Sequence, residues 1–182
     1  MIPVLVAVVV LVLLPALSLV VMYNRFVRQR TLIDNSWAGV DVELTRRHDL
    51  IPRLVDTVKG YAAHEQAVLA AVVSAREAAT AHHDESPGQR EGFEESLGGA
   101  VQQLLARAEA YPDLKASQNF LALQQELTET EDRIAAARRF YNGNVRAFNT
   151  RVATFPSNLV AEAFGFHSRE FFELHDEQAV AG

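Results

Sequence analysis

The sequence predicts an all-α protein in which an N-terminal transmembrane helix leads into an elongated antiparallel four-helix bundle. Residues 2–22 form an uncharged apolar run, and long stretches after it repeat apolar residues at helical spacing. The alternation of β-branched and polar residues that is typical of strands is missing. We therefore expect residues 1–22 to be the anchor, 23–165 the bundle and 166–182 a short C-terminal tail.

The composition excludes several kinds of chemistry. Of the 182 residues, 49% are hydrophobic, which argues against disorder. The formal net charge of −6 disfavours nucleic-acid binding. The chain has no cysteine, so disulfides, thiolate metal sites and a thiol nucleophile are ruled out.

The apolar run at residues 2–22 has the length of a membrane span, about 30 Å as a helix. A cleaved signal peptide is the alternative. It is disfavoured because the run is long, no Lys or Arg precedes it, and no clear small-x-small cleavage site precedes Tyr23. Arg25, Arg28 and Arg30 follow the run, and the positive-inside rule places them in the cytoplasm. We expect the N-terminus to lie outside and the bundle inside.

The first helix is expected to continue from the membrane to about Gly60. Its apolar stripe is Ile33, Trp37, Val40, Leu44, Ile51, Leu54, Val58 and Tyr61. Pro52 removes one backbone hydrogen bond and clashes with the carbonyl group of His48. This predicts either a kink at residues 48–51 or a break capped by Asp49. The stripe stays in register across the proline, which favours the kink.

Two shorter helices are expected next. The first runs from Ala63 to about His83, either separate or continuing the preceding helix, with an inner face of Val68, Ala71, Val72, Ala75 and Ala79. Residues 82–92 are expected to be an exposed, mobile loop. The second helix runs from about Arg90 to Ala110, with a face of Phe93, Leu97, Val101, Leu104, Leu105 and Ala108.

A second long helix is expected from Leu114 to about Ala153, with Asp113 as its N-cap. Its stripe is Phe120, Leu123, Leu127, Ile134, Tyr141, Val145, Phe148 and Val152. Ser157 is expected to cap a short helix that ends at Phe164 with Gly165 as its left-handed terminator. The tail after it is expected to dock on the bundle or on a partner through Phe166, Phe171, Phe172 and Leu174, with about eight disordered residues at its end.

Several separated segments carry a family resemblance. They are DLIPRLVDTVKGYAAHE at 49–65, EAYPDLKA at 109–116, RRFYN at 138–142, and the single residues Trp37, Asp41 and Asn149. On these segments the chain resembles the LemA family of bacterial membrane-anchored helical proteins. The resemblance implies one N-terminal span in the bacterial cell membrane and a four-helix bundle that is a mirror variant of the up-and-down topology. No enzymatic reaction is established for the family as a whole, and the tail here is shorter than in members with long tails.

Eight polar residues are candidates for an interaction site or a structural polar cluster: Arg46, Arg47, Asp49, Lys59, His64, Glu65, Asn142 and Asn149. Those on or beside the first long helix form either a recognition surface or charge pairs between helices, and charge pairing is favoured. Asn142 and Asn149 lie seven residues apart on one helical face. Because buried amides need partners, they either fix helix register, the favoured interpretation, or line a binding groove.

No catalytic residue, cofactor or metal ion is expected. The paired Glu-x-x-His motifs of di-metal bundles, the Gly-x-Ser-x-Gly motif and phosphate-binding loops are absent, and the pair His82 and His83 is interpreted as solvated. The sequence therefore favours a non-enzymatic scaffold or adaptor. Its expected partners are the lipid bilayer through residues 2–22, membrane-associated proteins and a second copy of itself. The alternatives are a subunit of an envelope-associated enzyme that uses polar residues near Pro52, and a sensor of membrane stress or of the lipid surface.

Overall fold

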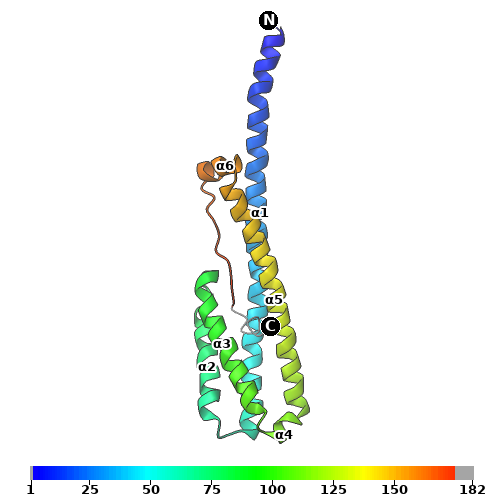
Figure 1. Ribbon diagram of the computed structural model, residues 1–182, viewed down its shortest axis with the longest axis vertical. Coiled ribbons are helices and arrows are strands. Elements are labelled where there is room, and N and C mark those ends of the chain that lie inside the picture. Colours follow the sequence, from blue (N-terminus) through cyan, green and yellow to red (C-terminus); the bar gives the residue numbers. More distant parts are fainter. Residues whose placement is uncertain (1, 175–182) are drawn as a thin grey trace, which may run out of the picture.

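The computed structural model describes residues 2–174, and of residues 4–8 only the backbone. The regular elements of this part of the chain are all helices, which confirms the all-α prediction (Figure 1). They are α1 (Ile2–Tyr61), α2 (Gln66–Ala81), α3 (Pro87–Ala108), α4 (Pro112–Lys115), α5 (Gln118–Ala153) and α6 (Ser157–Phe164). The disorder expected at the end of the tail falls outside the described residues.

Helix α1 is the spine of the molecule and runs unbroken through Pro52. The less favoured of the two alternatives at Pro52, a break capped by Asp49, is therefore wrong. The antiparallel α5 lies along α1 over most of its length, and the α2–α3 hairpin covers only the half farther from the N-terminus (Figure 1). Nearer the N-terminus, α6 and the extended residues 165–174 take the place of the hairpin.

The first part of α1 projects alone beyond the other helices (Figure 1). The large apolar side chains of residues 9–21 are 44–75% exposed. Within residues 2–174, α1 is the one helix long and apolar enough to cross a membrane.

The two predicted stripes form the core. On α5 the stripe is buried as predicted, except that Val152 is only partly covered. On α1 the stripe is buried except at two residues: Trp37 is half-buried, and Tyr61 at the end of the helix is 49% exposed. The assignment of Tyr61 to the core is therefore wrong. One buried cluster joins α1, α2, α3, α4 and α5 at the hairpin end, and a second joins α1, α5, α6 and residues 165–174.

The α2–α3 hairpin differs from prediction at both helix starts. Helix α2 begins at Gln66 because a turn occupies residues 62–65, and its inner face contains Leu69, whereas Ala71 is exposed. Helix α3 begins at Pro87 instead of about Arg90. Pro87 suits a first helical turn, and the Ser86 N–H donates to Gln89 Oε1 at 3.3 Å. The second half of the predicted mobile loop is therefore ordered helix.

The start of α5 was also predicted too early. Asp113 lies inside the single turn α4, and Ser117 precedes α5. The N–H groups of Lys115 and Ala116 bond to backbone carbonyl oxygens at 3.1 and 3.0 Å and not to the Asp113 carboxylate. At the other end, the predicted helix α6 and its terminator Gly165, with φ +70°, are confirmed. The predicted cap is wrong: Ser157 is the first helical residue, and its hydroxyl donates to the carbonyl oxygens of Arg151 and Thr154 at 2.8 Å instead of accepting from the first turn.

Candidate functional site

A charged residue completes the buried stripe of α1. Arg47 stands between Leu44 and Ile51 in the stripe and is 2% exposed. Its Nη2 donates to Glu94 Oε2 at 2.5 Å and to the Glu94 carbonyl oxygen at 3.1 Å. Its Nη1 donates to Glu131 Oε1 at 3.1 Å. Arg47 therefore ties α1 to both α3 and α5, in the region between the two apolar clusters.

Glu94 is the central acid of this network and is 1% exposed. Besides Arg47, its carboxylate has His48 Nε2 at 3.2 Å and Arg90 Nη2 at 3.8 Å. Burial on its own raises the pKa of Glu94, but the hydrogen bond from His48 and the charge of Arg47 outweigh it. The net pKa of Glu94 lies below its ordinary value, so the acid is ionised at neutral pH.

Arg90 extends the network to the turn between α2 and α3, which contains His83. It is 2% exposed and donates from Nη1 to Asp41 Oδ1 and to the His83 carbonyl oxygen, both at 2.8 Å. Its guanidinium carbon lies 5.2 Å from the centre of the Trp37 ring. Two buried arginines thus share the carboxylates of Glu94, Asp41 and Glu131, and the paired charges offset the cost of their burial. We call Asp41, Arg47, His48, Arg90, Glu94 and Glu131 the polar layer.

The backbone beside Pro52 has its own partner. Because proline has no N–H, the carbonyl oxygen of His48 lacks its helical donor. Arg76 Nε of α2 donates to this oxygen at 2.7 Å. The proline thereby creates an acceptor on α1 that helps to position the hairpin.

Two asparagines hold the extended residues 165–174. The Asn142 amide donates to the Phe172 carbonyl oxygen at 2.9 Å and accepts from the Phe172 N–H at 3.0 Å. The Asn149 amide makes the same pair of bonds with Arg169, at 2.9 and 2.8 Å. Each amide therefore acts toward the segment as a backbone group of a neighbouring strand does.

The spacing of the asparagines matches that of their partners. Seven residues of α-helix rise about 10 Å, and three residues of extended chain span about 10 Å. Between the two pairs, the Tyr141 hydroxyl donates to the Glu170 carbonyl oxygen at 2.8 Å, and burial raises the pKa of this tyrosine. One face of α5 thus fixes the register of residues 169–172.

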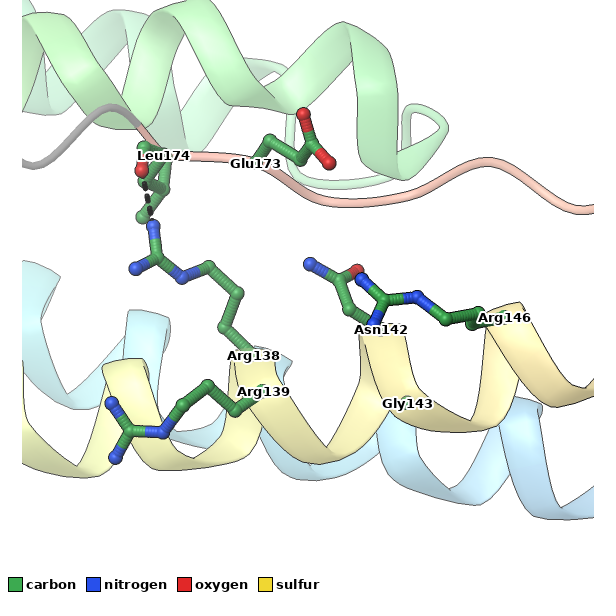
Figure 2. A pocket seen from close by; sticks show the side chains of 7 residues that line it. All are labelled: Arg138, Arg139, Asn142, Gly143, Arg146, Glu173 and Leu174. Atoms are coloured by element: carbon green, nitrogen blue, oxygen red, sulfur yellow. Dashed lines mark hydrogen bonds between the residues drawn. The ribbon is translucent and has the colours of Figure 1, made fainter.

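A groove lies between α5 and the extended segment that runs alongside it (Figure 2). Its volume is about 480 Å³, and its lining residues are Arg138, Arg139, Asn142, Gly143, Arg146, Glu173 and Leu174. Figure 2 shows Arg138 reaching the Leu174 carbonyl oxygen, to which it donates a hydrogen bond, whereas Arg139 points away from the segment. The groove is shallow and basic, and the side-chain amide of Asn142 in its lining is already hydrogen-bonded to the backbone of Phe172.

The eight candidate residues lie at separate places in the molecule. Arg47 belongs to the polar layer, and Asn142 and Asn149 hold the C-terminal segment. Glu65 accepts from the Tyr111 hydroxyl at 3.0 Å, and this bond raises the pKa of Tyr111. The remaining four are exposed along α1 and the turn after it: Arg46, Asp49, Lys59 and His64.

Candidate metal ligands do not form a cluster in the described part of the chain. No group of three or more His, Asp or Glu side chains that could hold a metal ion occurs among residues 2–174. His82 stacks on Phe93, with ring centres 3.9 Å apart, and His83 lies 3.1 Å from Asp84.

Comparison with known proteins follows the same segments of the chain. The sequence model of the LemA family matches residues 36–181, from the middle of α1 onward. The chain belongs to the LemA family. Protein LemA of Metamycoplasma hominis is 28% identical over 159 residues, which cover 86% of this chain and 71% of that protein.

Two magnetosome proteins are similar over a shorter region. MamQ 1 and MamQ 2 of Paramagnetospirillum magneticum are each 32% identical over 82 residues. These residues cover 45% of this chain and 30% of each magnetosome protein. The chain therefore spans less than a third of their length.

Proposed function

We propose that this LemA-family chain is a non-enzymatic membrane scaffold. Residues 2–22 of α1 would anchor it in the bacterial cell membrane, and the bundle would present protein-binding surfaces in the cytoplasm. The observation that carries this proposal is the continuity of α1. The helix with a bare apolar stretch at residues 9–21 is the same helix that forms the spine of the packed domain. Family membership and the similarity to magnetosome proteins support membrane association.

The proposed orientation rests on charge. Arg25, Arg28 and Arg30 are exposed directly after the apolar stretch. Such residues stay on the cytoplasmic side during insertion. Because the chain has no native cysteine, a single Ser74→Cys on exposed α2 can be labelled in intact cells with a membrane-impermeant maleimide. Labelling only after the membrane is opened is expected, and labelling before it would reverse the orientation.

The burial of the three central residues of the polar layer supports a structural role over catalysis. Arg47, Arg90 and Glu94 are each at most 2% exposed and are bonded to one another or to nearby groups. A substrate cannot reach them without separating the hairpin from α1. The alternative of an enzyme subunit that acts through the Pro52 region predicts a turnover that His64→Ala abolishes, together with a stoichiometric metal ion if that enzyme uses one.

The scaffold proposal is tested by crosslinking in the native membrane. Large apolar side chains are exposed away from the anchor, among them Val42 at 65% and Phe140 at 58%. A photo-reactive amino acid at each position is expected to capture a membrane-associated protein or a second copy of the chain. The same amino acid at exposed Asp132 is the control. A strictly monomeric protein that captures nothing beyond chaperones at either position would contradict the proposal.

The topology and the partners stay predictions as well. This proposal also includes the mirror variant of the four-helix bundle, a homo-oligomer and the lack of nucleic-acid binding. Each of these can be tested on the purified full chain. The net charge of −6 supports the last of them.

A further inference from the structure

The end of the bundle nearest the anchor carries a second exposed apolar surface. Helix α6 lies beside α1 where the bare apolar stretch ends (Figure 1). The rings of Tyr23 and Phe164 are 5.0 Å apart, and those of Phe26 and Phe166 are stacked at 4.8 Å. Tyr23 directly follows residues 2–22, so α6 stands at the level where α1 would leave a membrane.

Large apolar side chains are exposed in this region. Phe155, Leu159 and Phe164 are 75, 56 and 49% exposed, whereas Val160 and Ala161 on the inward side are buried. We call Phe155, Leu159 and Phe164 the apolar foot. Aromatic and leucine side chains of this kind favour the boundary between headgroups and acyl chains. Glu162 on the same helix is exposed, which suits a position among the headgroups and not in the hydrocarbon.

Positive charge lies at the same level. The rings of Phe26 and Phe148 are 5.7 Å apart, so the antiparallel helices bring Arg151 beside Arg25. Burial and the charge of Arg25 lower the pKa of Arg151. Among the described residues, neither arginine makes an ion pair with a carboxylate. Two guanidinium groups placed together in this way suit the phosphates of anionic lipids.

We propose that the apolar foot is a second membrane contact, seated in the interface of the leaflet that α1 leaves, with Arg25 and Arg151 on lipid phosphates. This inference rests on the proposed anchoring of α1. The occupant is the lipid surface because the foot is continuous with the apolar stretch of α1 and is flanked by basic side chains. Two contacts instead of one would stop the bundle from swivelling on its anchor.

Spin labels at single cysteines test the contact on the full chain reconstituted in vesicles of zwitterionic and anionic lipid. Three variants are compared: Leu159→Cys in the foot, Leu121→Cys at the far end of the bundle, and Leu11→Cys in the anchor. Leu121 is a matched control because it is 51% exposed. Collision rates with oxygen and with a water-soluble nickel chelate report lipid and water.

The label at 159 is expected to be shielded from nickel, the label at 121 to be open to it, and the label at 11 to behave as in hydrocarbon. A label at 159 as open as that at 121, with 11 still in lipid, overturns the apolar foot and leaves the anchor intact. Nickel access at 11 as well would instead overturn the anchoring itself.

The arginines are tested in the same vesicles. Arg25→Gln and Arg151→Gln are each expected to lower the ratio of shielded to open label at 159 about fivefold when the lipid is anionic. Arg133→Gln on the exposed far part of α5 is the control and should leave the ratio unchanged. An equal ratio in all three variants would remove the lipid phosphates from the proposal.

Discussion

A proline on one helix can require a hydrogen-bond donor from another helix, and the carbonyl oxygen of His48 is an example. Pro52 leaves this oxygen without its helical donor, and the bond that Arg76 makes to it is partly buried. The Arg76 side chain supplies the donor and fixes the height of α2 on α1. Helix α1 is continuous through Pro52, and the bond from Arg76 replaces the backbone hydrogen bond that the proline removes.

This pairing predicts a coupling between Arg76 and Pro52. Arg76→Gln is expected to lower the free energy of unfolding by about 2 kcal/mol, because a charged donor to a partly buried carbonyl oxygen is lost. In a Pro52→Ala background the backbone N–H is restored, and the same substitution should cost less than half as much. A double-mutant cycle by urea unfolding in detergent micelles measures the coupling. Equal costs in both backgrounds would contradict it.

Glu94 gives the polar layer a pH dependence. Glu94→Gln leaves two buried arginines undercompensated, and a loss of about 3 kcal/mol in the free energy of unfolding is expected at neutral pH. Because the pKa of Glu94 is lowered from 4.5 in the folded chain, its contribution is complete above pH 4.5 and disappears as the pH falls through the folded value.

The difference in unfolding free energy between the unchanged protein and Glu94→Gln should therefore be constant from neutral pH down to about pH 5 and shrink below it. Glu77→Gln, on the exposed side of α2, is the control and should stay within about 0.5 kcal/mol at every pH. A difference that grows on acidification would refute the assigned direction of the pKa shift.

Part of the polar layer follows from the sequence. Continuing the α1 stripe from Leu44 to Ile51 requires a core residue at 47, and continuing the α3 face backward from Leu97 requires core residues at 94 and 90. Charged residues occupy those places. A count of apolar residues alone therefore leaves residue 47 out of the α1 stripe and begins the α3 face only at Phe93. The pairing of Arg47 with Glu94 depends on how the helices meet, and spacing within one helix does not contain that information.

At the scale of elements, residues 165–174 cover the part of the α1–α5 pair that the α2–α3 hairpin leaves uncovered. The hairpin covers only half of the α1–α5 pair, and the extended segment seals the other half with Phe166 and Phe172. An extended segment makes no backbone hydrogen bonds within itself. Side chains of α5 bond to its backbone instead, from Tyr141, Asn142 and Asn149. The asparagines therefore set the register of the tail and not of two helices.

Phe172 is expected to be the strongest point of this seal. It is fully buried, and its ring centre lies 5.3 Å from that of Trp37. Phe172→Ala should cost about 4 kcal/mol of unfolding free energy. Phe140→Ala, which removes an equal side chain that is 58% exposed on α5, should change it by less than about 0.5 kcal/mol. Similar costs for the two variants would mean that the segment does not seal the core in solution.

The elements that depend on periodicity were predictable, and their starts were not. The long stripes of α1 and α5 identify both helices because each residue adds to the same pattern. The start of α3 depends on local capping by Ser86 and Gln89, and the start of α5 depends on the extra turn of α4. The docking of the extended tail had no periodic signal, although its phenylalanines and the two asparagines both hinted at a partner.

At the scale of the whole molecule, the proposed function requires that one helix do two jobs. In that proposal the same helix would cross the membrane at residues 2–22 and carry the packed domain beyond it. The all-α class, the long apolar N-terminal helix and the family were all predictable from the sequence. The partner was not, because exposed side chains such as Val42 show where a protein can bind and carry no record of which protein does.

The distance between spin labels at Leu11→Cys and Arg46→Cys, in the full chain reconstituted in bilayers, tests this claim most directly. Both positions are exposed on α1. An unbroken helix from the membrane into the bundle predicts a single narrow distance of about 50 Å. A broad or much shorter distance, or loss of the label at residue 11 from the mature protein, would contradict it.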